Sequence, residues 1–278
     1  MVKFDFTNVL ITGADGMLGA YIDFGIKTNR DTLNIQDLDS VMSFVQKRRP
    51  SAIIHLAAAT DTNRSEEDPA YAYGVNSVGT LNVALAAESV GAVFVYVSTS
   101  RVFEGDKIGP YTEAEQPHPK SVYGKSKYIG EVIASTVASE YIIARGCWLF
   151  GGGRERDTKF FGNVLRQLGN DTIAALNDVY GSPTYVKDFV GGLKTLLEEG
   201  KRGVFHVSNT GCVTRADIVQ YILELTKSKT KVEPVKRTFF KNGHLLPPNE
   251  SISSEKIHLR PWREALGEYI QEEWKFGN

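Results

Sequence analysis

The sequence predicts an α/β fold with a doubly wound parallel sheet, and three features carry that prediction. A short apolar run near the N-terminus leads into a glycine-rich turn at residues 8–19. Two more apolar runs of strand length follow at residues 51–59 and 92–97, each after a segment with helical periodicity. Strands that alternate with helices in this way are typical of a parallel sheet covered by helices.

Composition narrows the class of protein. The 278 residues are 42% hydrophobic and 23% charged, with a formal net charge of -1, which suits an ordinary globular chain of one large domain or slightly more. Near-zero net charge gives no reason to expect a nucleic acid or a membrane surface as partner. No apolar run is long enough to span a membrane and the N-terminus lacks signal-peptide features, so we expect a cytoplasmic protein. Cys147 and Cys212 do not suffice for a disulfide framework or zinc site, and we expect no metal.

The first predicted element is the strand Asn8–Ile11, which feeds a Gly-x-x-Gly-x-x-Gly turn and then a helix. Such a unit is typical of dinucleotide binding in a Rossmann-type fold, because the glycines let the backbone approach a pyrophosphate and the helix N-terminus offers free N–H groups. The spacing differs from the Gly-x-Gly-x-x-Gly of classical dehydrogenases. The cofactor-binding residues expected here are Gly13, Asp15, Gly16, Met17, Leu18 and Gly19.

The second strand, expected near Ile26–Arg30, lies so close to Gly19 that the intervening helix must be short. Dinucleotide folds usually end this strand with an acid that binds the ribose 2′-hydroxyl. This chain has Asn29 and Arg30 there, and Asp31 arrives late. An arginine without a well-placed acid suits a 2′-phosphate, so NADP(H) is favoured and NAD(H) is the alternative. An exposed polar turn is an equally good interpretation of the stretch.

The middle of the chain continues the alternation. We expect a helix over Asp37–Arg49 closed by Pro50, and then a strand over residues 51–59 whose small exit residues leave room for a ligand. His55 is interpreted as a hydrogen-bonding residue at the strand end rather than a catalytic base. A helix around Asp68–Val90 carries Asn76, which could bond backbone groups near the active site.

Tyr123 and Lys127 are four residues apart at the start of an apolar, helix-like run. On a helix, residues i and i+4 share a face, so the phenol and the ammonium can point into one site. A nearby ammonium favours the phenolate, which makes a tyrosine with an ordinary pKa near 10 usable as a proton donor or acceptor. A surface tyrosine with a neighbouring lysine is the competing interpretation, and this motif alone does not overturn it.

Together these segments resemble the extended short-chain dehydrogenase/reductase superfamily, and most closely its dTDP-4-dehydrorhamnose reductase family. The resemblance covers essentially the whole chain. It rests on the glycine-rich turn and on the segments Leu56–Ala59, Ser98–Ser100, Pro110–Glu113, Tyr123–Lys127, Arg145–Gly151, Gly181–Tyr185 and Arg260–Leu266.

The resemblance implies a catalytic set of Thr99, Tyr123 and Lys127. Tyr123 would protonate the oxygen of a sugar carbonyl, Lys127 would bond the nicotinamide ribose, and Thr99 would donate a hydrogen bond to that oxygen. Further cofactor contacts would come from Leu56, Ala57 and Ala58. Substrate contacts would come from Thr60, Arg101, Trp148, Asn163 and Tyr185.

The chain departs from the family at one substrate-facing position. The family usually has Ser-Thr-Asp-Tyr-Val-Phe where this chain has Ser98-Thr99-Ser100-Arg101-Val102-Phe103. An arginine in place of the family's tyrosine could bind a diphosphate or a carboxylated sugar, or could block the pocket. The substrate can therefore differ from that of the family.

The domain boundaries follow from the resemblance as well. Residues 1–150, with roughly 172–195, are expected to form the NAD(P)-binding domain. Roughly 151–171 and 196–278 are expected to form a smaller, interleaved sugar-nucleotide domain. Within it we expect a helix at Phe160–Leu168, a strand at Val204–Val207, a helix at Thr214–Leu225 capped by Thr214, a strand at Val232–Val235 and a helix at Trp262–Trp274.

The leading hypothesis is an NAD(P)H-dependent reductase of a nucleotide-linked 4-keto-6-deoxysugar. A sugar-nucleotide epimerase of the same superfamily is one alternative. A non-catalytic regulatory subunit of the methionine adenosyltransferase type is the other, and Arg101 keeps it open. The expected partner is a nucleotide sugar, and the sequence leaves open whether the chain forms a homodimer.

Overall fold

The computed structural model describes residues 4–240 and 246–276, which form two compact units. The first unit holds the described residues up to Phe103, then 116–146 and 190–205. The second holds 104–115, 147–189 and the described residues from His206 onward. We expected roughly 172–195 in the cofactor domain, but of these only 190–195 belong to the first unit. The reason is strand pairing, because the strands between residues 172 and 185 pair with partners in the second unit. Residues 104–115 and 147–150, also expected in the cofactor domain, belong to the second unit, whereas 196–205, expected in the sugar-nucleotide domain, belong to the first.

The first unit is built on a six-stranded sheet with the order β10-β5-β4-β3-β1-β2. Its strands are β1 (Val9–Thr12), β2 (Ile26–Lys27), β3 (Ala52–His55), β4 (Val93–Thr99), β5 (Tyr141–Gly146) and β10 (Gly203–His206). The pairings from β2 through β5 are parallel. Every residue of β1 and β3 is buried, as expected for a parallel sheet with both faces covered. The predicted doubly wound parallel sheet is confirmed.

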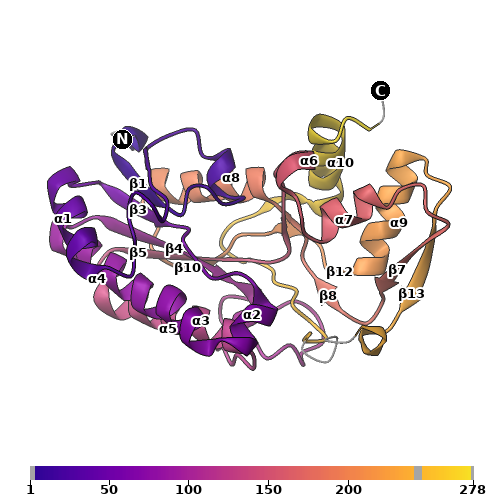
Figure 1. The fold of residues 1–278 in the computed structure, drawn as a ribbon, viewed down its shortest axis with the longest axis horizontal. Coiled ribbons are helices and arrows are strands. Elements are labelled where there is room, and N and C mark those ends of the chain that lie inside the picture. The colour runs from indigo at the N-terminus through magenta and orange to yellow at the C-terminus, as the bar shows by residue number, and fades with distance from the viewer. Residues whose placement is uncertain (1–3, 241–245, 277–278) are drawn as a thin grey trace. The chain divides into compact units, whose positions relative to one another are not determined.

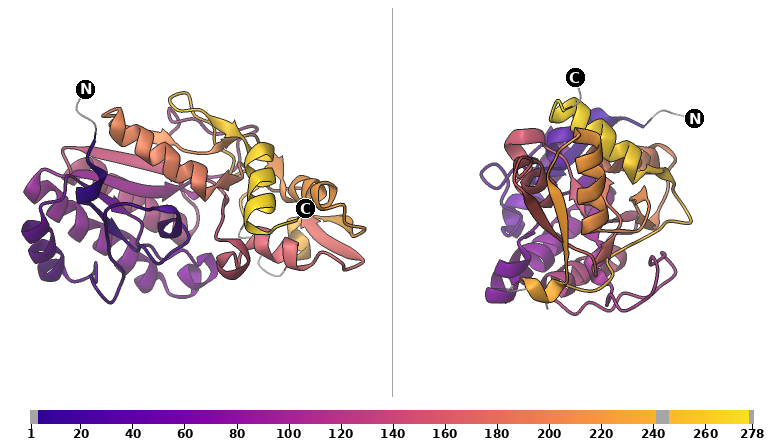
Figure 2. Two further views of the ribbon diagram at one scale, coloured as in Figure 1. Left: turned by 90° about the horizontal axis from the view of Figure 1, so that it is seen from above. Right: turned by 90° about the vertical axis from the view of Figure 1, so that its right-hand side faces the viewer.

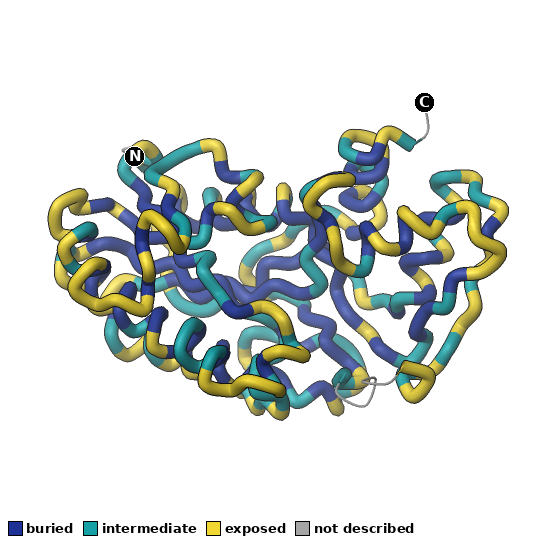
Figure 3. The backbone as a smooth tube through the Cα atoms, viewed as in Figure 1, coloured by how far each residue is buried: buried dark blue, intermediate teal, exposed yellow. Residues whose placement is uncertain are grey.

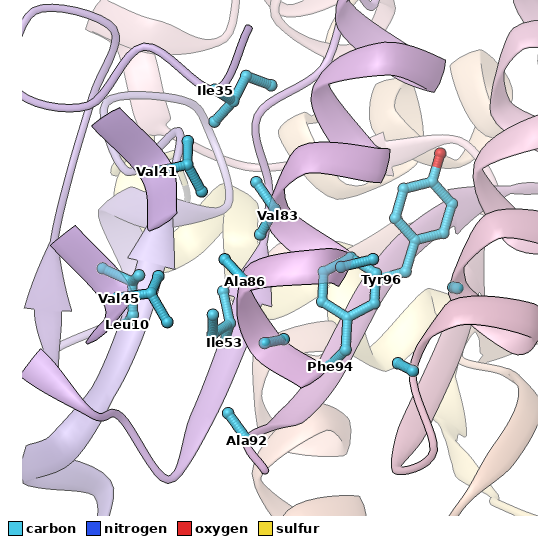
Figure 4. Close-up of a cluster of buried hydrophobic side chains, with 14 of the residues drawn as sticks. Leu10, Ile35, Val41, Val45, Ile53, Val83, Ala86, Ala92, Phe94 and Tyr96 are labelled. Atoms are coloured by element: carbon cyan, nitrogen blue, oxygen red, sulfur yellow. The ribbon is translucent and has the colours of Figure 1, made fainter. Parts of the chain in front are cut away.

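Helices cover the two faces of this sheet. Figure 1 shows α1 (Leu38–Arg48), α4 (Thr80–Val90) and α5 (Val122–Val137) on one side, and α8 (Val186–Glu198) on the other. The strands are the most deeply buried part of the unit (Figure 3). Under α1, α4 and α5 lies an apolar cluster that Figure 4 draws in close-up; it includes Leu10, Val41, Val45, Ile53, Val83, Ala86, Phe94 and Tyr96.

The segment after the glycine-rich turn is shorter than the sequence predicts. The expected first helix is a single 3-10 turn, Gly19–Tyr21, and the expected strand Ile26–Arg30 is the two-residue β2. Asn29 explains the early end of the strand. Its side-chain carbonyl accepts hydrogen bonds from the backbone N–H groups of Asp31 (3.1 Å) and Thr32 (3.0 Å), and such a turn diverts the chain from the ladder.

The helix expected around Asp68–Val90 is divided. It consists of α3 (Pro69–Tyr73), a π-helical segment (Gly74–Gly79) and α4, preceded by α2 (Thr62–Glu67). Asp68 caps α3 by accepting a hydrogen bond from the Tyr71 N–H at 3.0 Å. The π-helical segment contains Asn76, and π-bulges of this kind are frequent at functional sites.

Strand pairs and short helices make up the second unit. The pairs are β6 (Leu149–Phe150) with β9 (Thr184–Tyr185), β7 (Thr172–Leu176) with β13 (Lys231–Val235), β8 (Tyr180–Gly181) with β12 (Val213–Thr214), and β11 (Asn209–Thr210) with β14 (Leu259–Pro261). The helices are α6 (Gly153–Arg156), α7 (Phe160–Arg166), α9 (Arg215–Thr226) and α10 (Trp262–Glu273).

Local signals in this unit are confirmed. Thr214 caps α9 and forms a capping box with Asp217, as the predicted N-cap requires. Helix α9 packs on the β7–β13 pair, which the right-hand view of Figure 2 shows. Across both units, no helix among the described residues is both long enough and apolar enough to cross a membrane.

Candidate active site

The sheet topology locates a ligand site before any side chain is considered. From β1 the chain connects to β2 on one side, whereas β3 lies on the other side of β1. Ligands of open α/β sheets bind beyond the carboxyl ends of the strands where the strand order reverses in this way. Here that place lies between the segments that follow β1 and β3, which are the glycine-rich turn and residues 56–60.

Two glycines hold these segments at close range. Gly13 has a φ of +68°, and a Cβ on it would lie 2.5 Å from the backbone N of Ala57. A Cβ on Gly19 would lie 2.0 Å from the Ala14 carbonyl oxygen. The turn is also tied to the next segment by a bond from Ala14 N–H to Thr28 O (2.9 Å). The glycine turn and the segment after β3 are therefore in backbone contact at Gly13 and Ala57.

The polar residues at the end of β2 form a small network. The Asn29 side-chain amide donates to the Asp15 carboxylate at 2.7 Å, so two predicted cofactor residues bond each other. Arg30 follows with an exposed side chain, and the exposed acid Asp31 lies one residue further on. Met17 and Leu18 are half-buried beside the turn. The first charged residue after β2 is thus a cation, Arg30, rather than an acid.

Asn76 anchors the segment after β3. Its side-chain oxygen accepts from Ala59 N–H (2.8 Å), and its amide donates to Ala59 O (3.1 Å) and to the Ser126 hydroxyl (2.9 Å). Ser126 lies on α5 between Tyr123 and Lys127, so one buried amide connects the Leu56–Ala59 segment with the helix of the tyrosine and the lysine. The expectation that Asn76 bonds backbone groups is confirmed. Thr60 follows with an exposed side chain.

Tyr123 and Lys127 lie on the first two turns of α5, which Ser121 caps through a hydrogen bond from Gly124 N–H (3.0 Å). Tyr123 is half-buried, whereas Lys127 is only 3% exposed. The Lys127 ammonium donates to Val97 O at 2.8 Å and lies 4.2 Å from the centroid of the Tyr96 ring. Burial lowers the pKa of Lys127 from 10.5 to about 7, and the negative charge of Glu131 partly opposes this.

Thr99 ends β4, and its hydroxyl accepts a hydrogen bond from Arg101 N–H at 3.2 Å. The turn after it, Ser100–Val102, lies against the start of α5, because a Cβ on Gly124 would meet Arg101 O at 2.3 Å. The strand end with Thr99 and the helix start with Tyr123 are therefore neighbours. Arg101 is half-buried within this turn.

The structure contains a buried ion pair, between Glu131 and Arg145, that the sequence did not predict. Glu131 (3% exposed) accepts two hydrogen bonds from the Arg145 guanidinium (2.9 and 2.7 Å) and one from the Ser98 hydroxyl (2.5 Å). The signal that could have revealed Glu131 is its spacing, since Tyr123, Lys127 and Glu131 are four residues apart in turn. Arg145 lies on β5 and carries no comparable signal.

His55 has the structural role that the sequence suggested. Its Nδ1 lies 2.7 Å from the Thr12 hydroxyl and its Nε2 lies 3.2 Å from the Thr80 hydroxyl, so both ring nitrogens have partners. Burial, followed by the charge of Lys127, lowers its pKa to about 3. The imidazole is therefore neutral near pH 7 and is committed to hydrogen bonds inside the unit.

Three predicted substrate residues belong to the second unit. Trp148 has a φ of +41° and a half-buried ring, which stacks on the backbone at Gly181 and lies 5.2 Å from the Arg215 guanidinium carbon. Asn163 is exposed on α7. Tyr185 is only 2% exposed, because it stacks on Phe150 (5.5 Å between centroids) and bonds Glu273 through its hydroxyl (2.5 Å). Tyr185 is thus a packing residue of its unit.

Among the described residues there is no group of three or more His, Cys, Asp or Glu side chains placed to hold a metal ion.

The chain is similar in sequence to known proteins along nearly its whole length. The RmlD substrate binding domain family matches residues 7–274. The spore coat polysaccharide biosynthesis protein SpsK of Bacillus subtilis is 31% identical over 96% of this chain and 98% of its own length. The dTDP-4-dehydrorhamnose reductase of Mycobacterium tuberculosis is 32% identical over 93% of this chain and 90% of its own.

A solved structure of similar fold extends the match to three dimensions. The dTDP-4-dehydrorhamnose reductase of Bacillus anthracis, solved in complex with NADP, has a TM-score of 0.90 and 32% identity, and the match covers 95% of this chain and 98% of that one. The family match, the two relatives and this structure each span nearly the whole chain. The chain therefore belongs to the RmlD substrate binding domain family.

Proposed function

We propose that the chain is an NADPH-dependent reductase of a nucleotide-linked 4-keto-6-deoxysugar, with NADH as the alternative cofactor. The observation that carries the proposal is the buried Lys127 ammonium. It is held at 2.8 Å by Val97 O near the carboxyl end of β4, on the same helix as Tyr123. Support comes from the similarity to dTDP-4-dehydrorhamnose reductases, one of them solved in complex with NADP.

The cofactor loops fit a dinucleotide. A side chain at Gly13 would strike the backbone of Ala57, so the glycine lets the two segments approach closely at the switch point of the sheet. Backbone approach of this kind suits a pyrophosphate. Three residues beyond β2, the exposed Arg30 would supply the positive charge that a ribose 2′-phosphate requires, while Asn29 is held by Asp15. These residues favour NADPH over NADH.

The catalytic set would work as follows. When bound, the reduced nicotinamide supplies the hydride that the carbonyl carbon of the sugar accepts. Tyr123 donates its phenolic proton to the carbonyl oxygen, and the Thr99 hydroxyl donates a hydrogen bond to the same atom. The Lys127 ammonium would stabilise the phenolate that Tyr123 becomes, and it would hold the nicotinamide ribose when the cofactor is bound. The phenol then regains its proton from solvent.

Substrate contacts are proposed at residues with accessible side chains. Thr60 is exposed and Arg101 half-buried, and Arg101 offers a guanidinium to a phosphate or carboxylate. Trp148 presents part of its ring, which suits the apolar side of a deoxysugar, and Asn163 is exposed. Tyr185 is left out because it is buried. We also propose a cytoplasmic location, and a homodimer stays an open expectation.

A substrate panel tests the proposal. Purified protein is mixed with NADPH or NADH and a series of nucleotide-linked 4-keto-6-deoxysugars, and loss of the absorbance of the reduced nicotinamide is followed. We expect oxidation with at least one sugar and a lower KM for NADPH than for NADH. If NADPH binds but no sugar supports its oxidation, the reductase proposal fails. An epimerase or a regulatory subunit then becomes the better account.

A further inference from the structure

Tyr96 contacts Lys127 at both ends of the lysine residue. The Lys127 ammonium lies 4.2 Å from the centroid of the Tyr96 ring, and the Tyr96 hydroxyl donates a hydrogen bond to the Lys127 backbone carbonyl at 3.2 Å. The carbonyl oxygen of Val97, the next residue on β4, accepts a hydrogen bond from the Lys127 ammonium. Consecutive residues of one strand therefore hold the side chain and the backbone of Lys127 together.

Helix α5 is shaped to receive this phenol. A Cβ at Gly130 would lie 2.1 Å from the Tyr96 hydroxyl oxygen and 2.5 Å from the ring carbon that bears it. Glycine inside a helix costs stability relative to alanine, so its presence here matches the space that Tyr96 needs. Gly191 in α8 offers a contrast, because a Cβ there meets no atom within 4 Å.

The ring itself is fixed from the strand side. It stacks with His55 (6.0 Å between centroids, 24° between planes) and with Phe94 (6.3 Å, 28°). Tyr96 is fully buried. Figure 4 shows its hydroxyl pointing away from the aliphatic side chains of the cluster. A buried ring held on its sides by aromatic neighbours has little freedom to move away from the ammonium.

We propose that Tyr96 is a positioning residue for Lys127. The face of its ring holds the ammonium in place, and its hydroxyl fixes α5 on β4. The proposal rests on the proposed reductase function for its catalytic consequence. The contact between Tyr96 and Lys127 is independent of that function. An aromatic face stabilises a cation without a counter-charge, which suits a lysine that must stay charged in a buried place.

The other polar groups around Tyr96 and Lys127 are accounted for. Tyr123 and Glu131 face them from α5, His55 from β3 and the Thr80 hydroxyl from α4. Glu131 is paired with Arg145 and Ser98. His55 is neutral near pH 7, because burial lowers its pKa to about 3. Burial also raises the pKa of Tyr96 well above its ordinary value, so its phenol stays protonated.

The test compares Tyr96→Phe with Tyr96→Leu in the full chain. Lysine side chains are labelled with ¹³C at Cε, and the Lys127 resonance is assigned by its absence in Lys127→Met. The NMR titration midpoint of Lys127 is then read directly. Tyr96→Phe keeps the ring, so the midpoint should stay near that of the unchanged protein. Tyr96→Leu removes the ring, so the midpoint should fall by roughly one pH unit.

Turnover at fixed pH provides the second readout. At pH 7 we expect Tyr96→Leu to lose about fivefold in kcat, since a midpoint lowered by one unit leaves about a fifth as much charged lysine. The titration needs no substrate, so a failure of the reductase proposal leaves the positioning proposal testable. A folded Tyr96→Leu variant with an unchanged Lys127 midpoint would overturn it.

Gly130→Ala keeps the test decisive if Tyr96→Leu does not fold. The added methyl group displaces the phenol without altering Tyr96 itself, and the Lys127 midpoint should move. Gly191→Ala is the matched control, because its methyl group enters open space, and its Lys127 midpoint should not move. Equal midpoints in the two alanine variants would contradict the proposal.

Discussion

Burial and the charge of Glu131 shift the pKa of Lys127 in opposite directions. The residue is 3% exposed, and burial lowers its pKa from 10.5 to about 7 while Glu131 acts to raise it. In the unfolded chain the same ammonium is solvated and holds its proton up to pH 10.5. The folded state therefore binds fewer protons between pH 7 and 10.5, so the contribution of Lys127 to stability increases with pH through that window. Below pH 7 the cost of burying the charge is fully present.

Lys127→Met should therefore raise the free energy of unfolding near pH 7 and abolish turnover. The full cost of the buried charge is about 5 kcal/mol by linkage, and lost hydrogen bonding will reduce the measured gain. Between pH 7 and 9 the stability difference between variant and unchanged protein should shrink by about 2 kcal/mol. Urea unfolding at the two pH values measures this. A difference that is constant or grows with pH would contradict the buried-ammonium account.

Several residues of the site carried signals in the sequence, and several did not. Tyr123 and Lys127 are visible because a helix turns their spacing of four into one face. Tyr96 is not visible, because an aromatic residue in an apolar strand looks like any other core residue. The sequence could not show that Tyr185 is buried rather than available to a substrate. Its burial against Phe150 and Glu273 depends on packing between segments that are far apart in the sequence.

Among the elements, the turn from β1 to β2 depends most on single residues. Helices and strands with clear periodicity, such as α1, β4, α5 and α9, lie where the sequence predicts them. The first helix and β2 do not, because the side-chain bonds of Asn29 end the strand early. Local hydrogen-bonding competition of this kind is weakly encoded in hydrophobic periodicity.

Gly13→Ala should distort this turn. The substitution places a methyl group 2.5 Å from the Ala57 backbone and forces a φ of +68° on alanine. We expect a destabilisation of about 1–3 kcal/mol from strain, and at least a tenfold loss of NADPH affinity. Thermal unfolding and fluorescence titration with NADPH measure the two effects.

Gly16→Ala is the matched stability control for that experiment. A Cβ at Gly16 lies 3.4 Å from its nearest atom, Gly13 O, so the free energy of unfolding should change by less than about 0.5 kcal/mol. Equal free energies of unfolding of the two alanine variants would show that the close approach of the turn to Ala57 does not contribute to stability.

In the whole molecule, the proposed cofactor loops and catalytic set all lie in the first unit, whereas the capped helix α9 lies in the second. The sheet of the first unit could be predicted, because the alternation of strands and helices is visible in the hydrophobic pattern of the sequence. The unit boundaries do not, since they depend on which short strands pair, such as β7 with β13. Pairing of two- to five-residue strands leaves little trace in composition.

Thr214→Ala tests whether the units have separate roles. Loss of the capping box should destabilise the protein by about 1 kcal/mol, and NADPH affinity should stay within about twofold of the unchanged protein because α9 carries no proposed cofactor contact. Thr214→Ser, which keeps the capping hydroxyl, should restore most of the stability. A tenfold loss of NADPH affinity in Thr214→Ala would contradict this division of roles.

The central claim is that Tyr123 delivers the proton in a reductase reaction, and Tyr123→Phe tests it most directly. The measurement is steady-state oxidation of NADPH with the best sugar of the panel, alongside the Kd for NADPH. We predict that kcat falls by about 10²–10⁴ while Kd changes little, because only the phenolic hydroxyl is removed. A variant that turns over as fast as the unchanged protein would contradict the mechanism.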